Sequence, residues 1–576
     1  MISGGRHMAS DYTIMVGGEA GQGVQTIGLV LVKTFARSGW HVFADQDYES
    51  RIRGGHNFFR IRISDTEVQA ISEPVHILLA LNGETVDLHQ EELAEDGVIL
   101  VDSEEANPRP SLYKIPFERL AHEHAGNKKV QSAVALGSAL ACTRCNLATL
   151  EQVIQEQFSS GGSILIEENI KAVRAGYAHT RELLKGYTPL TCNAISHENQ
   201  ILVNGNEALA LGALAAGCKF ISAYPMTPAS SIVEYMASKS AQTGLVMVQA
   251  EDEIAAINMA LGASFAGVRA MTATSGGGFS LMVEALGLSG ITETPLVIME
   301  AQRGGPSTGL PTRTEQSDLE FVIHASHGEF PRIVLAPGNA QEAFVMGGEA
   351  FNLAEKYQLP VFVLTDQYLA TDYFATTKFE PAAIPIDRGI LWNSTDADPK
   401  EYKRYRFTES GISPRAFPGL SEALIMTTGD EHDEAGHITE HSQLRTDMMV
   451  KRLRKLDAFT YKDFPPTVYG DDVSDVTLIG WGSMWGAMRE AVDLLAQQGT
   501  KAKMIHFSLL WPFPQREAEQ LLSHTHTLVA VEQNATAQFA HLLRAETGIQ
   551  VDRTILRFDG RPISPDYIVQ HIQDGS

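Results

Sequence analysis

Three polar side chains of the sequence follow predicted buried strands and could take part in chemistry. Thr227 stands between two prolines in AYPMTPASS, Glu253 leads directly into the apolar stretch IAAINMALGA, and Arg303 follows the apolar run VIMEAQ. A hydroxyl beside helix amides suits a small anion, a carboxyl entering a buried helix is typical of a functional acid, and arginine recognises carboxylates. Because open α/β sheets bind ligands at the carboxyl edge of their strands, the set predicts an active-site rim.

Each of these residues also has a purely structural interpretation. Thr227 fits the N-cap of the following helix, with Pro228 at the first helical position. Glu253 closes the acidic triplet EDE, and the helix dipole favours acids in a first turn. Each residue alone leaves this alternative open, whereas the complete set favours a site.

A glycine-rich turn and a stiff loop complete the predicted rim. Thr274, Ser275 and Gly276 begin the turn TSGGGF, between a strand and a helix. Ser307 and Thr308 lie in the Gly/Pro loop GGPSTGLPT, directly after Arg303. Glycines in such number let the backbone approach a ligand or a neighbouring subunit closely. We therefore expect both segments to line the same site.

Alternating strands and helices predict an α/β fold with three parallel-sheet domains. The strands are uninterrupted apolar runs, as in parallel sheets that helices cover on both faces. We expect α/β domains over 11–190, 195–373 and 471–576, with an extended linker region over 374–470. Residues 1–10, MISGGRHMAS, have the character of a cloning remnant and are left out of the prediction.

The composition excludes several classes of protein. The chain has 45 Lys and Arg against 70 Asp and Glu, and the resulting net charge of −25 disfavours binding to nucleic acid. No apolar run reaches the roughly 18 residues of a membrane span, and no apolar signal core opens the sequence. Four cysteines do not make a disulfide framework. We therefore expect a cytoplasmic protein.

Two groups of potential metal ligands match no metal motif. Cys142 and Cys145 form a single CxxC pair, which cannot supply four ligands to zinc or to an iron–sulfur cluster. The histidines and acids of GDEHDEAGHITEH, residues 429–441, have no recognised ligand spacing. We expect a structural cysteine pair, a solvated or subunit-contacting loop, and no metal bound by this chain.

Four motifs resemble the alpha subunit of 2-oxoacid:ferredoxin oxidoreductases: AYPMTPASS, QAEDEIAAINMALGAS, TSGGGFSLM and QRGGPSTGLPT. The N-terminal GGEAGQGVQTIG resembles that family's gamma domain, here fused ahead of alpha. RYRFTESGISPRAFPG (404–419) and the 429–441 stretch are similar to its 2-oxoglutarate-type members. The resemblance implies a gamma-type Rossmann-like domain, a thiamine-diphosphate pyrimidine-binding domain and a transketolase C-terminal-like domain.

The resemblance also implies thiamine diphosphate chemistry and a role for each catalytic residue. Glu253 would contact N1′ of the aminopyrimidine and favour the tautomer that accepts a proton from the thiazolium ring. Thr227 would contact the substrate carboxylate or the cofactor, and Arg303 would hold the carboxylate and carbonyl of the substrate. The expected cofactor-binding set is Tyr224, Pro225, Thr227, Glu253, Thr274, Ser275 and Gly276. The expected substrate-binding set is Arg303, Ser307, Thr308, Arg404 and Arg406.

Missing motifs imply a partner subunit. The sequence has no GDG followed by a suitably spaced Asn, the family's magnesium–diphosphate site, and no four usable cysteines. The resemblance therefore implies a beta subunit that carries the diphosphate site, Mg²⁺ and a [4Fe–4S] cluster in an (alpha–beta)₂ heterotetramer. Coenzyme A would take the acyl group after decarboxylation, and ferredoxin the electrons. The reverse reaction, reductive carboxylation as in the reductive TCA cycle, uses the same site.

Alternatives stay open for the substrate and for the class of protein. We expect 2-oxoglutarate, with pyruvate, a branched-chain or an aryl 2-oxoacid as the alternatives. A second carboxylate needs a further cation, and the sequence does not choose among Arg51, Arg53, Arg313, Arg404, Arg406 and Arg415. A non-catalytic dinucleotide-binding or scaffold protein would use the glycine turns for structure only.

Overall fold

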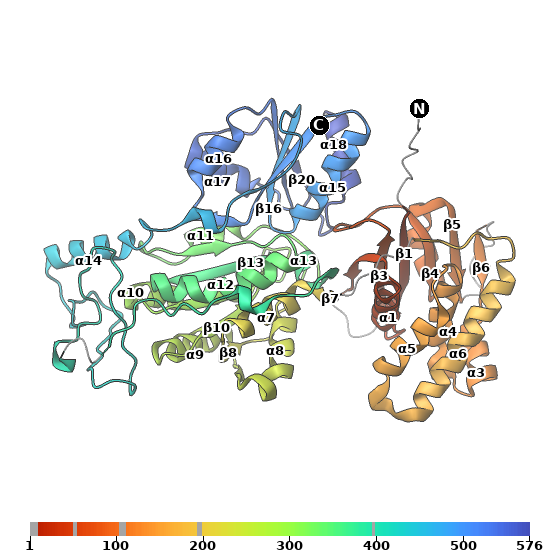
Figure 1. The fold of residues 1–576 in the computed structure, drawn as a ribbon, viewed down its shortest axis with the longest axis horizontal. Helices are drawn as coiled ribbons and strands as arrows, with labels where there is room; N and C mark the ends of the chain where they lie inside the picture. Colours follow the sequence, from red (N-terminus) through yellow and green to blue (C-terminus); the bar gives the residue numbers. More distant parts are fainter. Residues whose placement is uncertain (1–9, 50–53, 103–110, 193–198, 394–397, 576) are drawn as a thin grey trace. The chain divides into compact units, whose positions relative to one another are not determined.

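The computed structural model of the chain describes residues 10–49, 54–102, 111–192, 199–393 and 398–575 (Figure 1). The chain divides into two compact units. The first comprises residues 1–203, 372–378 and 564–566, and the second comprises 204–371, 379–563 and 567–576. The first unit is built on one β-sheet and the second on two.

The sheet of the first unit has eight strands in the order β6-β5-β4-β1-β3-β2-β14-β7. β1, β4, β5 and β6 run parallel, whereas β3 is antiparallel to both β1 and β2. The strands are β1 (Asp11–Ala20), β2 (His41–Asp47), β3 (Gly54–Ser64), β4 (Val75–Ala80), β5 (Leu93–Val101), β6 (Leu112–Lys114), β7 (Gln200–Asn204) and β14 (Tyr373–Thr377).

Helices and short 3-10 turns connect the strands of the first unit. They are α1 (Val24–Arg37), α2 (Gly83–His89), η1 (Gln90–Glu92), α3 (Phe117–Ala125), η2 (Lys128–Val130), α4 (Gln131–Ala141), α5 (Leu147–Gln157), η3 (Ser159–Gly161) and α6 (Gly162–Leu183). Helix α1 buries Ile27, Leu31 and Phe35, which recur every four residues on one face. Gly28 lies between them, and a Cβ there would stand 2.2 Å from the Phe59 ring of β3. The glycine therefore lets the helix pack directly on the sheet.

The larger sheet of the second unit has seven strands in the order β18-β12-β13-β11-β10-β8-β9. Neighbouring strands are parallel, except that β18 is antiparallel to β12. The strands are β8 (Phe220–Ala223), β9 (Val246–Gln249), β10 (Ala270–Thr274), β11 (Leu296–Gln302), β12 (Ile333–Leu335), β13 (Pro360–Asp366) and β18 (Leu509–Trp511). The helices are α7 (Gly205–Ala215), α8 (Ser230–Thr243), α9 (Glu253–Phe265), α10 (Gly276–Thr292), α11 (Leu319–His324), α12 (Ala340–Tyr357) and α13 (Gln367–Thr371).

The smaller sheet has five strands in the order β15-β17-β16-β19-β20, all parallel except β15. Its strands are β15 (Thr467–Gly470), β16 (Val476–Trp481), β17 (Ala502–Phe507), β19 (Thr527–Glu532) and β20 (Arg553–Leu556). The helices of this part are α15 (Met484–Gln497), α16 (Gln515–Leu522), α17 (Gln538–Thr547) and α18 (Pro565–Gln573). One apolar core joins both sheets, since Phe362 and Ile298 share a cluster with Trp481 and Phe507. The three sheets confirm the predicted α/β fold class.

Buried ion pairs anchor the segment that we expected to be an extended linker. Its helix α14 (Ser442–Arg454) carries Lys451, whose Nζ lies 2.7 Å from an Oε of Glu293 at the end of α10. Lys455 Nζ lies 2.6 Å from the other Oε. Removing one partner of a buried pair is costly, because the other charge is left buried and uncompensated. The segment also contains the short turns η4 (Pro381–Ala383), η5 (Pro399–Glu401) and η6 (Tyr461–Asp463).

Within the described ranges of the chain, no helix is long and apolar enough to cross a membrane.

Candidate active site

The predicted rim residues lie at one edge of the seven-stranded sheet. β8, β10 and β11 are neighbours in the sheet, and their carboxyl ends lead to Thr227, Ser275 and Arg303 respectively. β9 lies at the sheet edge beside β8 and leads to Glu253. Parallel strands place their carboxyl ends together, which is why side chains separated by up to 76 residues meet here.

The Glu253 carboxyl is buried and differs from the acid that caps its helix. It is the first residue of α9 and is 4% exposed, while the preceding Asp252 caps the helix by accepting a hydrogen bond from the Ala255 amide. No hydrogen-bond donor among the described residues reaches the Glu253 carboxyl. Burying a carboxyl without a hydrogen-bond partner costs folding free energy, unless a ligand or a water provides the partner. The cap and the acid are therefore different residues, and Glu253 is free to bind a ligand.

The glycine turn after β10 brings a helix terminus against Glu253. A Cβ on Gly278 would stand 2.8 Å from Oε1 of Glu253 and 2.3 Å from Oγ1 of Thr274. Ser275 is fully buried at the N-cap of α10, and its Oγ has no hydrogen-bond partner in the structure. The first amides of a helix have no intrahelical acceptor, so this turn also offers donors to a ligand.

Arg303 joins two loops of the rim. Its Nη1 donates a hydrogen bond of 2.8 Å to the backbone oxygen of Thr227. Burial lowers the pKa of Arg303 from its usual value, while the nearby Asp318 raises it. The guanidinium therefore stands as a half-buried cation at the rim, where it can receive an anionic substrate group.

The prediction that Thr227 caps the next helix is wrong. Helix α8 begins at Ser230, its N-cap is Ala229, and no side chain caps it. Thr227 lies in the preceding turn, where the Asn206 amide donates a hydrogen bond of 2.9 Å to the backbone oxygen of Pro228. The structure gives the Thr227 hydroxyl no hydrogen-bond partner among the described residues, so it can face a ligand.

Four other residues that we predicted to bind cofactor or substrate lie beside this rim: Tyr224, Pro225, Ser307 and Thr308. Tyr224 and Pro225 are exposed at the end of β8. Ser307 and Thr308 are exposed in the loop after Arg303, and the Ser307 oxygen would be 3.8 Å from a Cβ on Gly277. These contacts place the loop beside the first turn of α10.

Arg404 and Arg406 lie away from the rim. The Arg404 guanidinium donates to Oε1 of Gln358 and to the backbone oxygens of Thr292 and Glu293, at the end of α10 opposite to Gly276. A helix of 17 residues is about 25 Å long, so this guanidinium cannot touch a ligand beside Glu253. Arg406 is exposed in the same segment. Both residues therefore drop out of the proposed substrate set.

Arg415 is also committed to an internal contact, while Arg313 stays near the rim. Arg415 Nη2 donates 2.8 Å to Glu355, which also binds Arg269 and Arg388. Arg313 is half-buried, and its backbone oxygen accepts from the Gly304 amide in the rim loop. Arg51 and Arg53 lie outside the described residues.

Two acids of the site were missed in the sequence. Glu300 lies in β11 directly beside Thr274 of β10 and is fully buried. Asp318 precedes α11, and its Oδ2 would stand 2.2 Å from a Cβ on Gly276. Burial raises the pKa of Glu300. Burial also raises the pKa of Asp318, to about 6. The sequence offered one signal for Glu300, which is an acid inside the otherwise apolar run LVIMEAQ.

The stretch 429–441 is held by ion pairs within the chain. His432 is fully buried rather than solvated, and Glu431 binds Arg445 and Arg452. The described part of the chain contains no group of three or more His, Cys, Asp or Glu side chains that could hold a metal ion.

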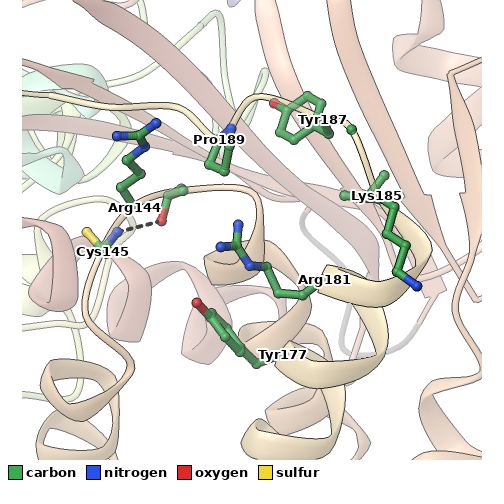
Figure 2. A pocket seen from close by; sticks show the side chains of 10 residues that line it. Arg144, Cys145, Tyr177, Arg181, Lys185, Tyr187 and Pro189 are labelled. Atoms are coloured by element: carbon green, nitrogen blue, oxygen red, sulfur yellow. Dashed lines mark hydrogen bonds between the residues drawn. The ribbon is translucent and has the colours of Figure 1, made fainter.

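A separate hollow of about 600 Å³ lies in the first unit, with Arg144, Arg181 and Lys185 around it (Figure 2). It opens where α4 and α6 end, and helix carbonyls there favour cations. Arg181 already lies over the Tyr177 ring and reaches the Ala141 oxygen at 3.4 Å. Burial raises the pKa of the neighbouring Cys145 thiol to about 11, which keeps it unreactive.

The geometry of the rim fits the aminopyrimidine end of thiamine diphosphate. The buried Glu253 carboxyl, which no described residue satisfies, could bind a ring nitrogen, and Gly278 leaves the space that a Cβ would fill. Residues 211–452 match the family described as "Pyruvate flavodoxin/ferredoxin oxidoreductase, thiamine diP-bdg". Residues 13–179 match "Pyruvate ferredoxin/flavodoxin oxidoreductase", and residues 474–568 match "Pyruvate:ferredoxin oxidoreductase core domain II". The chain is thus an oxidoreductase subunit with a thiamine-diphosphate-binding domain.

Relatives of nearly full length define the family. The 2-oxoacid:ferredoxin oxidoreductase subunit alpha of Saccharolobus solfataricus is 35% identical over 97% of both chains. The 2-oxoglutarate oxidoreductase subunit KorA of Mycobacterium tuberculosis is 30% identical over 99% of this chain and 92% of its own. A structure of 2-oxoglutarate:ferredoxin oxidoreductase from Magnetococcus marinus, with 2-oxoglutarate, coenzyme A and succinyl-CoA bound, superimposes with a TM-score of 0.90 at 34% identity, covering 98% of this chain and 99% of that one. The protein belongs to the alpha subunits of the 2-oxoacid:ferredoxin oxidoreductases, which confirms the resemblance seen in the sequence.

Proposed function

We propose that this chain is the gamma–alpha fused subunit of a 2-oxoglutarate:ferredoxin oxidoreductase and that it binds the pyrimidine end of thiamine diphosphate. The observation that carries the proposal is the buried Glu253 carboxyl, which lies beside Gly278 and has no hydrogen-bond partner in the described part of the chain. The relatives and the solved structure named for 2-oxoglutarate support the choice of substrate. Coenzyme A is the proposed acyl acceptor, because that solved structure contains it.

The residues of the rim have separate tasks in this proposal. Bound thiamine diphosphate supplies a nucleophilic ring carbon and an electron sink for decarboxylation. Glu253 holds a proton at the pyrimidine nitrogen N1′, and its burial keeps water from competing for that proton. Arg303 orients the 2-oxoacid through its carboxylate, and the Thr227 hydroxyl presents a further donor beside it. Tyr224, Pro225, Ser275 and Gly276 would form the walls around the cofactor.

A beta subunit is the proposed partner that completes the site. Several apolar side chains near Glu253 are exposed and would face water if this subunit were alone. They are Val246 and Met247 on the edge strand β9, Ile254 and Met259 on α9, and Leu281 on α10. The outer edge of β9 has no neighbouring strand among the described residues, and an open strand edge with apolar side chains favours a protein contact. The partner would supply the diphosphate site, Mg²⁺ and the [4Fe–4S] cluster, and ferredoxin would accept the electrons.

We propose that Arg313 binds the second carboxylate of 2-oxoglutarate. It stands at the end of the loop that begins with Arg303, and the Gly304 amide bonds to its backbone oxygen. Burial lowers the pKa of Arg313, and the nearby Arg561 lowers it further, so a carboxylate there would relieve cation repulsion.

The test is the activity of this chain co-expressed with its partner subunit. Reduction of a viologen dye is measured with coenzyme A and a panel of 2-oxoacids: 2-oxoglutarate, pyruvate, a branched-chain acid and an aryl acid. The proposal expects the highest kcat/KM with 2-oxoglutarate. A preference for any other acid would overturn the substrate, and the absence of thiamine-dependent reduction with every acid would overturn the activity.

A further inference from the structure

The loop of residues 303–317, called the rim loop here, carries both Arg303 and Arg313 and is folded on itself. The Leu310 amide donates a hydrogen bond of 2.8 Å to the backbone oxygen of Gly304. The Arg313 amide in turn donates a hydrogen bond of 3.1 Å to the backbone oxygen of Leu310. Because these bonds connect the two arginines through the backbone, a contact that fixes the end of the loop also fixes its arginines.

Gln316, near the end of the rim loop, is fully buried and is bound by residues of the smaller sheet. Its amide donates 2.7 Å to the backbone oxygen of Gln533, and its Oε1 accepts 3.2 Å from the Gln533 amide. Its backbone oxygen accepts 3.1 Å from Nδ2 of Asn534, and its Nε2 donates 3.1 Å to the backbone oxygen of Trp481. Each of the four polar groups of Gln316 therefore has a partner, as buried polar groups require.

A second contact lies directly beside Arg313. Gln533 Nε2 donates a hydrogen bond of 3.1 Å to Oγ1 of the buried Thr314, and Gln533 Oε1 accepts 3.4 Å from the Ile563 amide. In the same segment as Ile563, a Cβ on Gly560 would stand 2.9 Å from Cβ of Arg313. Gln533 therefore binds the rim loop on one side and the segment that packs on Arg313 on the other.

These contacts come from the carboxyl edge of the smaller sheet. Trp481 ends β16, Gln533 and Asn534 follow β19, and residues 557–563 follow β20. These three strands are parallel neighbours in the sheet. Open parallel sheets bind ligands at this edge. Here the edge binds the rim loop of the larger sheet instead.

We infer that the carboxyl edge of the smaller sheet positions the rim loop for the 2-oxoacid, with Gln533 and Asn534 as positioning residues. They act through Arg303 and Arg313 and touch no reacting atom. The arginines can hold a substrate in one orientation only while the loop keeps one conformation, and loss of a buried hydrogen bond leaves an unpaired polar group. The inference rests on the proposed function for its kinetic test, whereas the contact itself can be tested without turnover.

The variant T314V tests the contact in the assembled enzyme. Valine keeps the shape of threonine and leaves Gln533 Nε2 without its acceptor. The loss of one buried hydrogen bond amounts to roughly fivefold, so KM for 2-oxoglutarate should rise about fivefold while kcat stays within about twofold. T314S keeps the hydroxyl and should restore the wild-type KM. An unchanged KM in T314V, or no rescue in T314S, would overturn the inference.

T477V is the matched control for T314V. Thr477 is buried near the start of β16, where its hydroxyl bonds to that of Ser474 at 3.2 Å. The substitution makes the same chemical change in the same sheet, but at the end away from the rim loop. It should lower the unfolding temperature and leave KM unchanged. An equal rise of KM in T477V and T314V would show a general loss of structure and would overturn the inference.

A double-mutant cycle with Q533A isolates the part of the effect that Gln533 carries, because Thr314 Oγ1 also accepts 3.4 Å from the Tyr368 amide. Q533A keeps the backbone bonds to Gln316 and removes the side-chain bond to Thr314. Since Q533A and T314V remove the same bond, the double variant should raise KM by less than the product of the two single effects. Fully multiplicative effects would show that the two residues act independently, against the inference.

Hydrogen exchange followed by mass spectrometry tests the contact without any turnover. In the full chain with its partner subunit, the amides of residues 304–313 should exchange roughly fivefold faster in T314V and Q533A than in wild type or T477V. Unchanged exchange in both variants would overturn the contact even if the enzyme is active. Conversely, faster exchange in these variants of a complex that reduces no dye with any 2-oxoacid would refute the proposed function and leave the contact intact.

Discussion

Arg303 Nη1 and the backbone oxygen of Thr227 are joined by a hydrogen bond of 2.8 Å, which spans the end of the intervening strand β10. The bond ties the loop after β11 to the turn after β8. It fixes the position of the arginine relative to the glycine turn between them. The rim is therefore one connected structure, and changes to any of its members should affect the others.

Replacing Arg303 by Ala should impair the use of substrate more than the retention of thiamine. The change removes both the cation and the bond to Thr227, so kcat/KM should fall roughly 100-fold. Steady-state kinetics beside a thiamine assay measure the two effects. R303K, which keeps the charge but loses the planar fork, should recover only part of the rate. Equal loss of substrate use and of bound thiamine in R303A would contradict the assignment.

Replacing Glu253 by Gln should abolish turnover while the subunits still assemble. The neutral amide cannot hold a proton at N1′ as the acid does, and general acid–base contributions amount to roughly 10²–10⁴ in rate. Viologen reduction and gel filtration with the partner give the two readouts. E251Q is the matched control, because Glu251 is an exposed acid two residues away. Near-normal rates in E253Q would refute the assignment.

Replacing Gly278 by Ala should weaken thiamine binding, because its Cβ would press on Thr274 and Glu253 at 2.3 and 2.8 Å. Crowding of this kind costs about 1–3 kcal/mol, which isothermal titration with thiamine diphosphate and the partner would detect. G262A offers the control, since a Cβ on Gly262 of α9 meets nothing within 4 Å. An unchanged affinity in G278A would show that the turn does not approach the cofactor.

Replacing Arg313 by Ala should raise KM for 2-oxoglutarate and leave pyruvate kinetics unchanged. Only the former substrate has a second carboxylate for this cation to bind. The same assay with both acids gives the comparison within one variant. A parallel loss with both substrates would assign Arg313 to the general structure of the rim loop.

The ion pairs of Glu431 should make the stability of the second unit depend on acid pH. Burial alone would raise the pKa of Glu431, but hydrogen bonds from Arg452 and Arg445 lower it to about 2. A lowered carboxyl pKa stabilises the fold above the ordinary value of 4.5, and this contribution is lost as the pH falls from there toward 2. Thermal unfolding should show a steeper acid loss for wild type than for E431Q.

At neutral pH, E431Q should lower stability by about 3 kcal/mol, because Arg452 is left buried without its carboxylate. E440Q is the control, since Glu440 is exposed in the same stretch. A similar unfolding temperature for both variants would exclude a stabilising role of the pair.

The sequence predicted those features of the fold that depend on residues close together in the chain. Continuous apolar runs and glycine turns were enough for the α/β class and for the edge where Thr227, Glu253 and Arg303 meet. Their individual roles in catalysis stay predictions. The antiparallel strand β3 was not predicted, because its pairing with β1 and β2 depends on partners far away in the sequence.

The sequence also did not predict which side chains contact one another in the folded chain. Arg404 and Arg415 were open candidates for a substrate carboxylate, but internal carbonyl and carboxylate groups from distant segments bind both. Glu300 and Asp318 escaped notice because neither belongs to a recognisable motif, and only the fold places them beside Thr274 and Gly276 respectively. Contacts of this kind appear only when the chain is folded.

Helix α10 has both of its ends fixed by different parts of the chain. Gly276 begins it at the rim, and Glu293, just past its last turn, pairs with Lys451 and Lys455. The helix is about 25 Å long and connects these two ends. We therefore expect that loss of either lysine would disturb the start of the helix as well as its end, so substitutions that touch no ligand could still alter the proposed cofactor site.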